Sequence, residues 1–309
     1  TVVFDQSLSP SSRDMLEAFS ASGYFDITHG VDSYEDVNRY IDSGQAQVGI
    51  IFPPDFARQL HRGAPAAVQV IVDASDSMVA NQAIAIANSI GLLKSQQVLF
   101  QKTRVSSPPY DIRVRPWYNP DGITAYYMVP AILGIIVTMT MVIITSVAIV
   151  REREQGTLEQ LMVTPVKPLE LMIGKIVPYI VLGYLQITVA LLVAVLVFQV
   201  PIRGSLLQLY LLTLFFITAS LGLGLMISNL AQTQMQAFQM SFFVMLPSIL
   251  LSGFLFPRAA MPKIIYFISY LIPLTYYLDI IRGIVLKGIG FNYLIGQVTS
   301  LLVFSVVVL

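Results

Sequence analysis

The 309-residue sequence contains no cysteine, which excludes disulfide bonds, thiol catalysis and cysteine-based metal sites. Its two histidines, His29 and His61, have no metal-ligand spacing, so we expect structural or surface positions for both. The motif GxxxxGK[ST] is missing as well, and the chain therefore has no P-loop with which to bind ATP. These absences predict no catalytic residue and no metal or cofactor held by the chain itself.

Charge is scarce and unevenly distributed. Charged residues make up 12% of the chain, and the formal net charge is zero. Residues 1–121 hold thirteen of the eighteen acidic residues but only nine of the eighteen lysines and arginines. An acidic excess without a basic stripe argues against a nucleic-acid partner. From residue 122 onward charge occurs only in short clusters between apolar segments, which predicts a soluble domain followed by a membrane domain.

Residues 1–121 have the pattern of an α/β domain. Strand-like runs at 1–5, 24–28, 46–52 and 66–73 alternate with helix-like stretches at 9–21, 33–43 and 54–61. A long helix is predicted near 76–104, with Ser75 as its N-cap, and a short strand around Ile112 and Val114 follows it. The polar cluster at 70–78 fits a strand end followed by a helix cap better than a metal or nucleophile site.

Residues 122–309 have the pattern of a helical membrane domain. Five apolar segments are each long enough to cross a bilayer core, approximately 123–150, 176–198, 205–228, 236–256 and 291–309. The region 257–290 contains Pro273, five charged residues and several aromatic rings, and it predicts two interfacial helices or a re-entrant pair. The span interiors carry no ionisable residue, which argues against ion-coupled carriers and intramembrane proteases.

The stretch "REREQGTLEQLMVTP", residues 151–165, directly follows the first span. Gly156 interrupts the helical pattern, Thr157 and Gln160 form a capping box, and Pro165 ends the short helix that follows. An apolar stripe on that helix is made by Leu158, Leu161 and Met162. A helix this short is not stable alone, so it packs either on its own neighbouring helices or in a groove of a partner protein. The density of Arg and Lys on this side favours the cytoplasm.

The pattern "ERE-GT-EQL-VTP" resembles the signature that follows the second membrane helix of ABC-2 type permeases. The layout of nearly the whole chain is also similar, including the loop "NLAQTQMQAFQM" and the segment "LSGFLFP". The subclass with a large extracytoplasmic domain between its first and second helices fits best. The resemblance implies an α-helical polytopic membrane domain with five visible spans, a sixth span before residue 1, and an α/β extracytoplasmic domain at 1–121.

The resemblance further implies that the cytoplasmic loop 151–175 holds a coupling helix that docks on a separate P-loop ATPase, which binds ATP and Mg. The docking residues that the resemblance implies are Arg151, Glu152, Arg153, Glu154, Gly156, Thr157, Glu159, Leu161 and Pro165. In this interpretation the three glutamates form charge-assisted hydrogen bonds, the glycine makes the bend and the leucine is the buried anchor.

By the same resemblance the chain is the permease subunit of an ATP-driven exporter in the bacterial plasma (inner) membrane. It would pair with a second permease subunit, contact membrane lipid and a periplasmic partner, and move hydrophobic or amphipathic small molecules or lipids outward. Candidate pathway residues are Tyr126, Tyr127, Met139, Met141, Gln186, Gln236 and Gln239. Ordinary helix packing explains the same residues. Two alternatives stay open, a polysaccharide or polymer export permease and a membrane-tethered ligand-sensing adaptor without transport activity.

Overall fold

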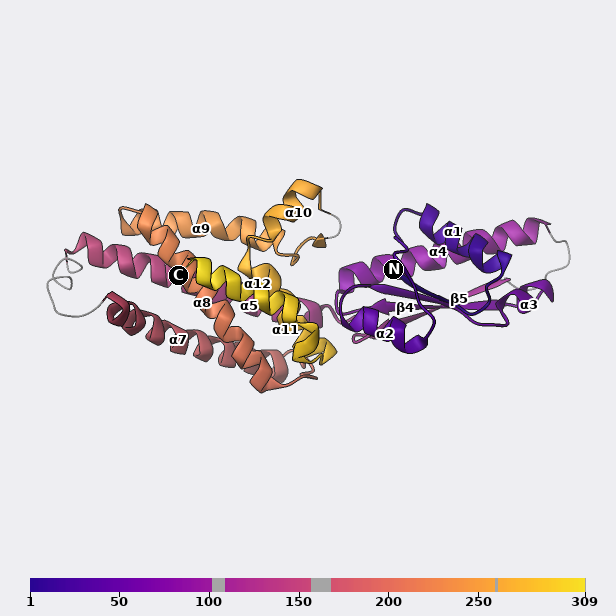
Figure 1. Ribbon diagram of the computed structural model, residues 1–309, viewed down its shortest axis with the longest axis horizontal. Helices are drawn as coiled ribbons and strands as arrows, with labels where there is room; N and C mark the ends of the chain where they lie inside the picture. The colour runs from indigo at the N-terminus through magenta and orange to yellow at the C-terminus, as the bar shows by residue number, and fades with distance from the viewer. Residues whose placement is uncertain (102–108, 157–167, 259–260, 309) are drawn as a thin grey trace. The chain divides into compact units, whose positions relative to one another are not determined.

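The computed structural model describes residues 1–101, 109–156, 168–258 and 261–308. The chain forms two compact units, Thr1–Thr124 and Ala125–Leu309 (Figure 1).

The N-terminal unit is built on a five-stranded sheet in the order β2-β1-β3-β4-β5. The strands are β1 (Val2–Asp5), β2 (His29–Gly30), β3 (Val48–Phe52), β4 (Ala66–Asp73) and β5 (Tyr110–Trp117). Neighbouring strands are parallel except β3 and β4, which are antiparallel, and β5 forms one edge of the sheet. The predicted strand at 24–28 is wrong, because only the two residues of β2 pair with β1 in that part of the chain.

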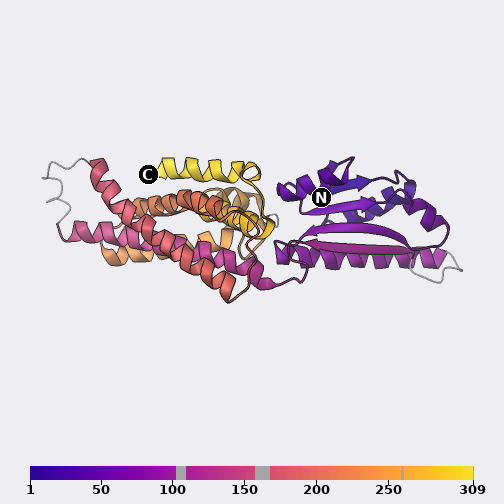
Figure 2. The same cartoon turned by 90° about the horizontal axis from the view of Figure 1, so that it is seen from below.

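Helices cover both faces of this sheet. They are α1 (Pro10–Ala21), α2 (Tyr34–Asp42), α3 (Phe56–His61) and α4 (Ser77–Gln101). Alternation along the strands directs Ile50 toward the core shared with α1, α3 and α4, and directs Ile51 toward the core shared with α2. The long helix α4 runs along β5 (Figure 2). Its N-cap is Asp76 and not Ser75, since the Asp76 carboxylate accepts from the amides of Met78 (3.0 Å) and Val79 (3.3 Å).

The C-terminal unit is helical. Its elements are α5 (Thr124–Glu154), α7 (Pro168–Leu196), α8 (Leu206–Leu230), α9 (Gln234–Leu251), α10 (Lys263–Ser269), α11 (Pro273–Arg282), a π-helix (Gly283–Lys287), a 3₁₀ turn (Phe291–Tyr293) and α12 (Ile295–Val308). Among the described residues four helices, α5, α7, α8 and α9, are long and apolar enough to cross a membrane. Within the fifth predicted span, 291–309, the structure describes the 3₁₀ turn and the 14 residues of α12, and a membrane crossing by this segment stays a prediction. The predicted span 236–256 begins two residues earlier and ends at Leu251.

The region predicted as interfacial or re-entrant is a helix pair bent by 79° between α10 and the Pro273–Lys287 segment. Helix α11 is among the most buried elements of the unit, and its position relative to the membrane stays a prediction. Tyr277 is fully buried, with its ring stacked on Phe216 at 3.8 Å and its hydroxyl 3.0 Å from Thr213 Oγ1. The sharp bend fits the re-entrant alternative. Arg282, one of the charges in this region, is buried within the unit, and its guanidinium stacks over the ring of Tyr127 at 4.0 Å.

The long helices differ in the fraction of their apolar residues that is buried within the unit. Two thirds (67%) of the apolar window of α8 is buried within the unit, whereas 22% is buried in each of α7 and α9. Helix α8 is therefore central, and α7 and α9 present apolar faces outward, as expected of a polytopic membrane domain.

Candidate functional site: the charged end of helix α5

Helix α5 continues past its apolar part and includes Arg151–Glu154 as its last turn. The predicted loop 151–175 is therefore shorter, since 151–154 belong to α5 and 168–175 to α7. Arginine and glutamate are strong helix formers, and the two arginines are well placed near the negative end of the helix dipole. The backbone bends at Gly156, whose φ of +67° lies in the left-handed region that favours glycine. Its amide donates to the Arg153 carbonyl at 3.2 Å, which ends the helix.

Glu152 connects this turn to α7. The Lys175 ammonium donates to Glu152 Oε2, and both side chains are partly shielded, with exposures of 23% for Lys175 and 31% for Glu152. Partial burial reduces screening of the pair by solvent, so it holds α5 against α7 more firmly than a fully exposed pair would.

Arg153 and Glu154 connect the same turn to the ends of α8 and α9. Arg153 Nη1 donates to the carbonyl of Ala231, the C-cap of α8, at 3.2 Å. The Glu154 carboxylate accepts from the backbone amide of Gln234, the first residue of α9, at 3.0 Å and also from its side-chain amide. A cation thus lies at a helix C-terminus and an anion at a helix N-terminus, where each is stabilised by the helix dipole and by backbone groups that lack partners within the helix.

Apolar packing supports these polar contacts from the membrane side. Val150, Ala231 and Ala237 are fully buried together, and Val147 and Met240 pack against them. We call the polar contacts above this layer the α5 junction, made by Glu152, Arg153, Glu154, Lys175, Ala231 and Gln234. The junction joins one helix end to three other helices, so a displacement of that end acts on all three.

The predicted docking residues fall in two groups. Thr157, Glu159, Leu161 and Pro165 lie outside the described residues, as does the predicted capping box. Arg151 to Gly156 are described: Arg151 is exposed, and Glu152 and Glu154 have the internal partners given above. Sequence reasoning missed Lys175, Ala231 and Gln234 as partners, because contacts between helices distant in sequence leave no local pattern. The polar run "NLAQTQMQ" at the start of α9 was the signal available.

The predicted pathway residues of α5 differ in their burial and in their contacts. Tyr126 is partly buried against the helical core, and the Tyr127 hydroxyl donates to the carbonyls of Gly253 (3.2 Å) and Phe254 (2.9 Å). Met141 is buried, whereas 38% of Met139 is exposed. A small cavity beside Met139, between α5, α8 and α9, has a volume of about 10 Å³, which holds no more than one water molecule.

The predicted pathway glutamines lie in three different settings. Gln186 on α7 donates to Thr140 Oγ1 on α5 at 2.9 Å, an interhelical contact. Gln236 is in the first turn of α9, where its Oε1 accepts from the Gln232 amide at 2.8 Å, and it therefore lies beside the α5 junction. Gln239 is exposed on the same helix. The pathway role of the whole set remains a prediction.

The chain is similar to bacterial transport permeases. The family model described as "ABC-2 family transporter protein" matches residues 1–309. "Probable multidrug ABC transporter permease YbhS" of Escherichia coli (strain K12) is 33% identical over 282 residues, which cover 91% of this chain and 74% of that protein. "Probable multidrug ABC transporter permease YbhR" of the same organism is 31% identical over 303 residues, covering 98% and 82%. "Inner membrane transport permease YhhJ", also from that strain, is 28% identical over 272 residues, covering 87% and 72%.

Proposed function

Because the chain belongs to the ABC-2 family of transporter proteins, we propose that it is the membrane-spanning permease subunit of an ATP-driven exporter. Membership confirms the resemblance seen in the sequence at the level of the family, and the matched relatives are named as permeases. Together with the long apolar helices this makes the chain a membrane-embedded permease. We further propose how the subunit couples to an ATPase, what it carries, which partners it has and how it is oriented.

The α5 junction is the observation that carries the coupling mechanism. A separate P-loop ATPase, which binds ATP and Mg, docks on the segment 151–165 and moves it when its nucleotide sites close. Arg153 and Glu154 pass that displacement to the adjoining ends of α8 and α9, and Glu152 passes it to α7. Such a displacement is effective because packed helices shift between discrete arrangements and do not deform continuously.

The cargo is a hydrophobic or amphipathic small molecule, or a lipid. Two relatives are named probable multidrug permeases, which supports a small-molecule cargo. The outward apolar faces of α7 and α9 support a second permease subunit beside this one, with cargo passing between the two. The small cavity within a single helical unit is consistent with a pathway formed only by the pair.

The proposed location is the bacterial inner membrane, with the segment after α5 in the cytoplasm and the N-terminal unit outside it. The relative YhhJ is named an "Inner membrane transport permease", which supports this location. An external α/β unit makes the chain one of the subclass with a large extracytoplasmic domain and leaves a face available to a periplasmic partner.

A pull-down tests the proposal. The tagged full-length chain, solubilised from its host membrane, should retain a P-loop ATPase, and Leu161→Asp should reduce the recovered ATPase at least tenfold because a charged group cannot fill an apolar groove. The matched control is Leu8→Asp, since Leu8 is 75% exposed in the N-terminal unit and its change leaves the segment 151–165 intact. Recovery of no P-loop ATPase by the unaltered chain, or equal recovery by the Leu161→Asp variant, would contradict the proposal.

A further inference from the structure

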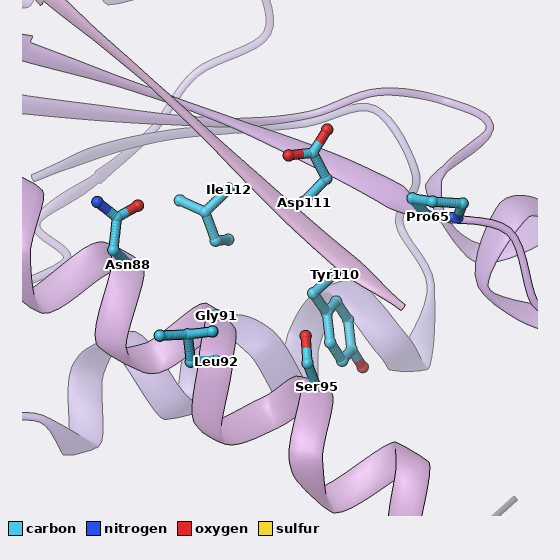
Figure 3. A pocket seen from close by; sticks show the side chains of 8 residues that line it. All are labelled: Pro65, Asn88, Gly91, Leu92, Ser95, Tyr110, Asp111 and Ile112. Atoms are coloured by element: carbon cyan, nitrogen blue, oxygen red, sulfur yellow. The ribbon is translucent and has the colours of Figure 1, made fainter. Parts of the chain in front are cut away.

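A groove on the N-terminal unit lies between α4 and β5 and has a volume of about 470 Å³. Figure 3 shows the helix residues on one side of it and the strand residues on the other. Its lining is Pro65, Asn88, Gly91, Leu92, Ser95, Tyr110, Asp111 and Ile112. Small-molecule sites in proteins are commonly about 300 to 1,000 Å³, mostly apolar with a few polar groups, and this groove falls in that class.

The groove follows from the way α4 crosses β5. Residues 88, 91, 92 and 95 recur at helical spacing, so they share the face of α4 directed at the strand. A Cβ at Gly91 would lie 2.4 Å from Cγ1 of Ile112, closer than atoms can approach. Glycine is therefore required at this crossing, and Asn88 and Ser95 flank the closest approach on either side (Figure 3).

Ser95 has a hydroxyl without a partner. The residue is 4% exposed, and its buried Oγ makes no hydrogen bond with any described residue. Helical serines elsewhere donate to the carbonyl four residues earlier, as Ser89 does to Ala85 at 2.8 Å on the same helix and Ser241 does to Ala237 at 2.7 Å. A buried hydroxyl without a partner is unfavourable, and a polar group of a ligand in the groove would supply the missing partner.

Apart from Asp111, the remaining lining is apolar or neutral. Leu92 is 64% exposed and lines the groove together with Ile112, so the two side chains offer apolar surface that a ligand in the groove can cover. Burial, and then the negative charge of Asp14, raise the pKa of the Tyr110 hydroxyl, so this hydroxyl keeps its proton and can donate. The Asp111 carboxylate pairs with Arg113 at 2.7 Å and points away from α4 in Figure 3.

We propose that the α4–β5 groove is a binding site for an uncharged amphipathic small molecule. Its polar group hydrogen-bonds to Ser95, and its apolar part covers Leu92 and Ile112. This proposal rests on the proposed function, because the ligand belongs to the proposed cargo class. Binding of the ligand to the groove nevertheless requires neither the ATPase nor the α5 junction.

The absence of cysteine from residues 1–309 allows a direct test with single-cysteine variants. They are made in the full-length chain, with any cysteine outside these residues replaced by serine, and are studied in lipid nanodiscs. Asn88→Cys places a thiol at the groove, and Ser89→Cys is the matched control, since both positions are exposed and adjacent but Ser89 does not line the groove. The probe is N-phenyl-1-naphthylamine, a neutral amphipathic molecule with one N–H donor. We expect the probe to slow maleimide labelling of the Asn88→Cys variant at least threefold and to leave the Ser89→Cys variant unchanged. Equal effects on both variants would overturn the proposal.

Ser95→Ala, introduced into the Asn88→Cys variant, tests the predicted hydrogen bond. The probe concentration for half-protection should rise about two- to tenfold, the value of one hydrogen bond, whereas Ser89→Ala should not change it. The thermal midpoint should not fall, since Ser95 makes no internal bond to lose. Leu92→Asp, at an exposed position, should abolish protection without unfolding the unit. Unchanged half-protection in both variants would refute the site, while the ATPase pull-down, which does not involve the groove, reports separately on the proposed function.

Discussion

Replacing Glu154 by alanine is the sharpest test of the α5 junction. The change removes the acceptor of two hydrogen bonds from Gln234 and the negative charge beside the first turn of α9. A side-chain acceptor at a helix N-terminus contributes about 0.5 to 2 kcal/mol, and a charge at the dipole about 0.3 to 1 kcal/mol. Glu154 is exposed, so solvent screening places the loss at the lower end, about 0.5 to 1 kcal/mol of the free energy of unfolding.

A loss this small leaves the chain folded, so an effect of the change on coupling to the ATPase can be measured separately from its effect on stability. We expect Glu154→Ala to keep the recovered ATPase unchanged but to lower the amount of dye exported per ATP hydrolysed, because α9 no longer follows the end of α5. The assay is ATP-dependent dye transport in inverted membrane vesicles, with thermal unfolding in detergent measured in parallel. Glu17→Ala, an exposed glutamate of α1, is the matched control.

A double-mutant cycle with Gln234→Ala isolates the contact itself. Gln234→Ala removes the side-chain donor and keeps the backbone amide, so the coupling energy between the two changes should be positive and about 0.3 to 0.5 kcal/mol. A coupling energy of zero together with unaltered export per ATP in the Glu154→Ala variant would refute the role of the junction.

Three further predictions concern stability. Gly156→Ala should destabilise the chain by about 1 kcal/mol in thermal unfolding because φ is +67° there, whereas Gly174→Ala, with open space on α7, should be neutral or stabilising. Tyr277→Phe and Thr213→Val should each lower the free energy of unfolding of the chain, because each removes one partner of a buried hydrogen bond. The double variant should lose less than the sum of the two single losses, with a coupling energy of about 0.6 to 1.7 kcal/mol in a double-mutant cycle. Because the pKa of Tyr110 is raised in the folded chain, the unfolded chain loses the hydroxyl proton at a lower pH. The stabilisation by the protonated Tyr110 is therefore complete below about pH 10 and is lost as pH rises through the folded pKa. Above pH 10 the thermal midpoint of the Tyr110→Phe variant should fall less steeply than that of the unaltered chain.

Much of the fold could be predicted because its signals are local. Apolar length located α5, α7 and α8, and the alternation of strand-like and helix-like segments located most of the N-terminal unit. The antiparallel pairing of β3 with β4 could not be predicted, since strand direction depends on contacts distant in sequence. Ser75 and Asp76 are both good caps by residue type, and only the backbone geometry decides between them.

The charged residues were the hardest to place. Asp279 and Arg282 suggested a headgroup position, which stays a prediction; within the unit, α11 is held in the bundle by the buried ring of Tyr277, and Arg282 rests on an aromatic ring. At the candidate site the sequence identified the cluster after the first span but not its internal partners. Lys175 lies 23 residues from its partner Glu152, and Gln234 lies 80 residues from its partner Glu154, so both contacts depend on how helix ends meet in the fold.

The edge strand β5 has a consequence for how two copies of the chain can assemble. A sheet edge offers unpaired backbone groups to any other strand, and sheets of two molecules can fuse along such edges. On β5 the residues Asp111, Arg113 and Arg115 place charge along the strand, and Pro116 has no backbone N–H to offer. Strand-to-strand fusion at this edge is therefore disfavoured, so in the proposed pair of permease subunits this edge strand does not promote aggregation.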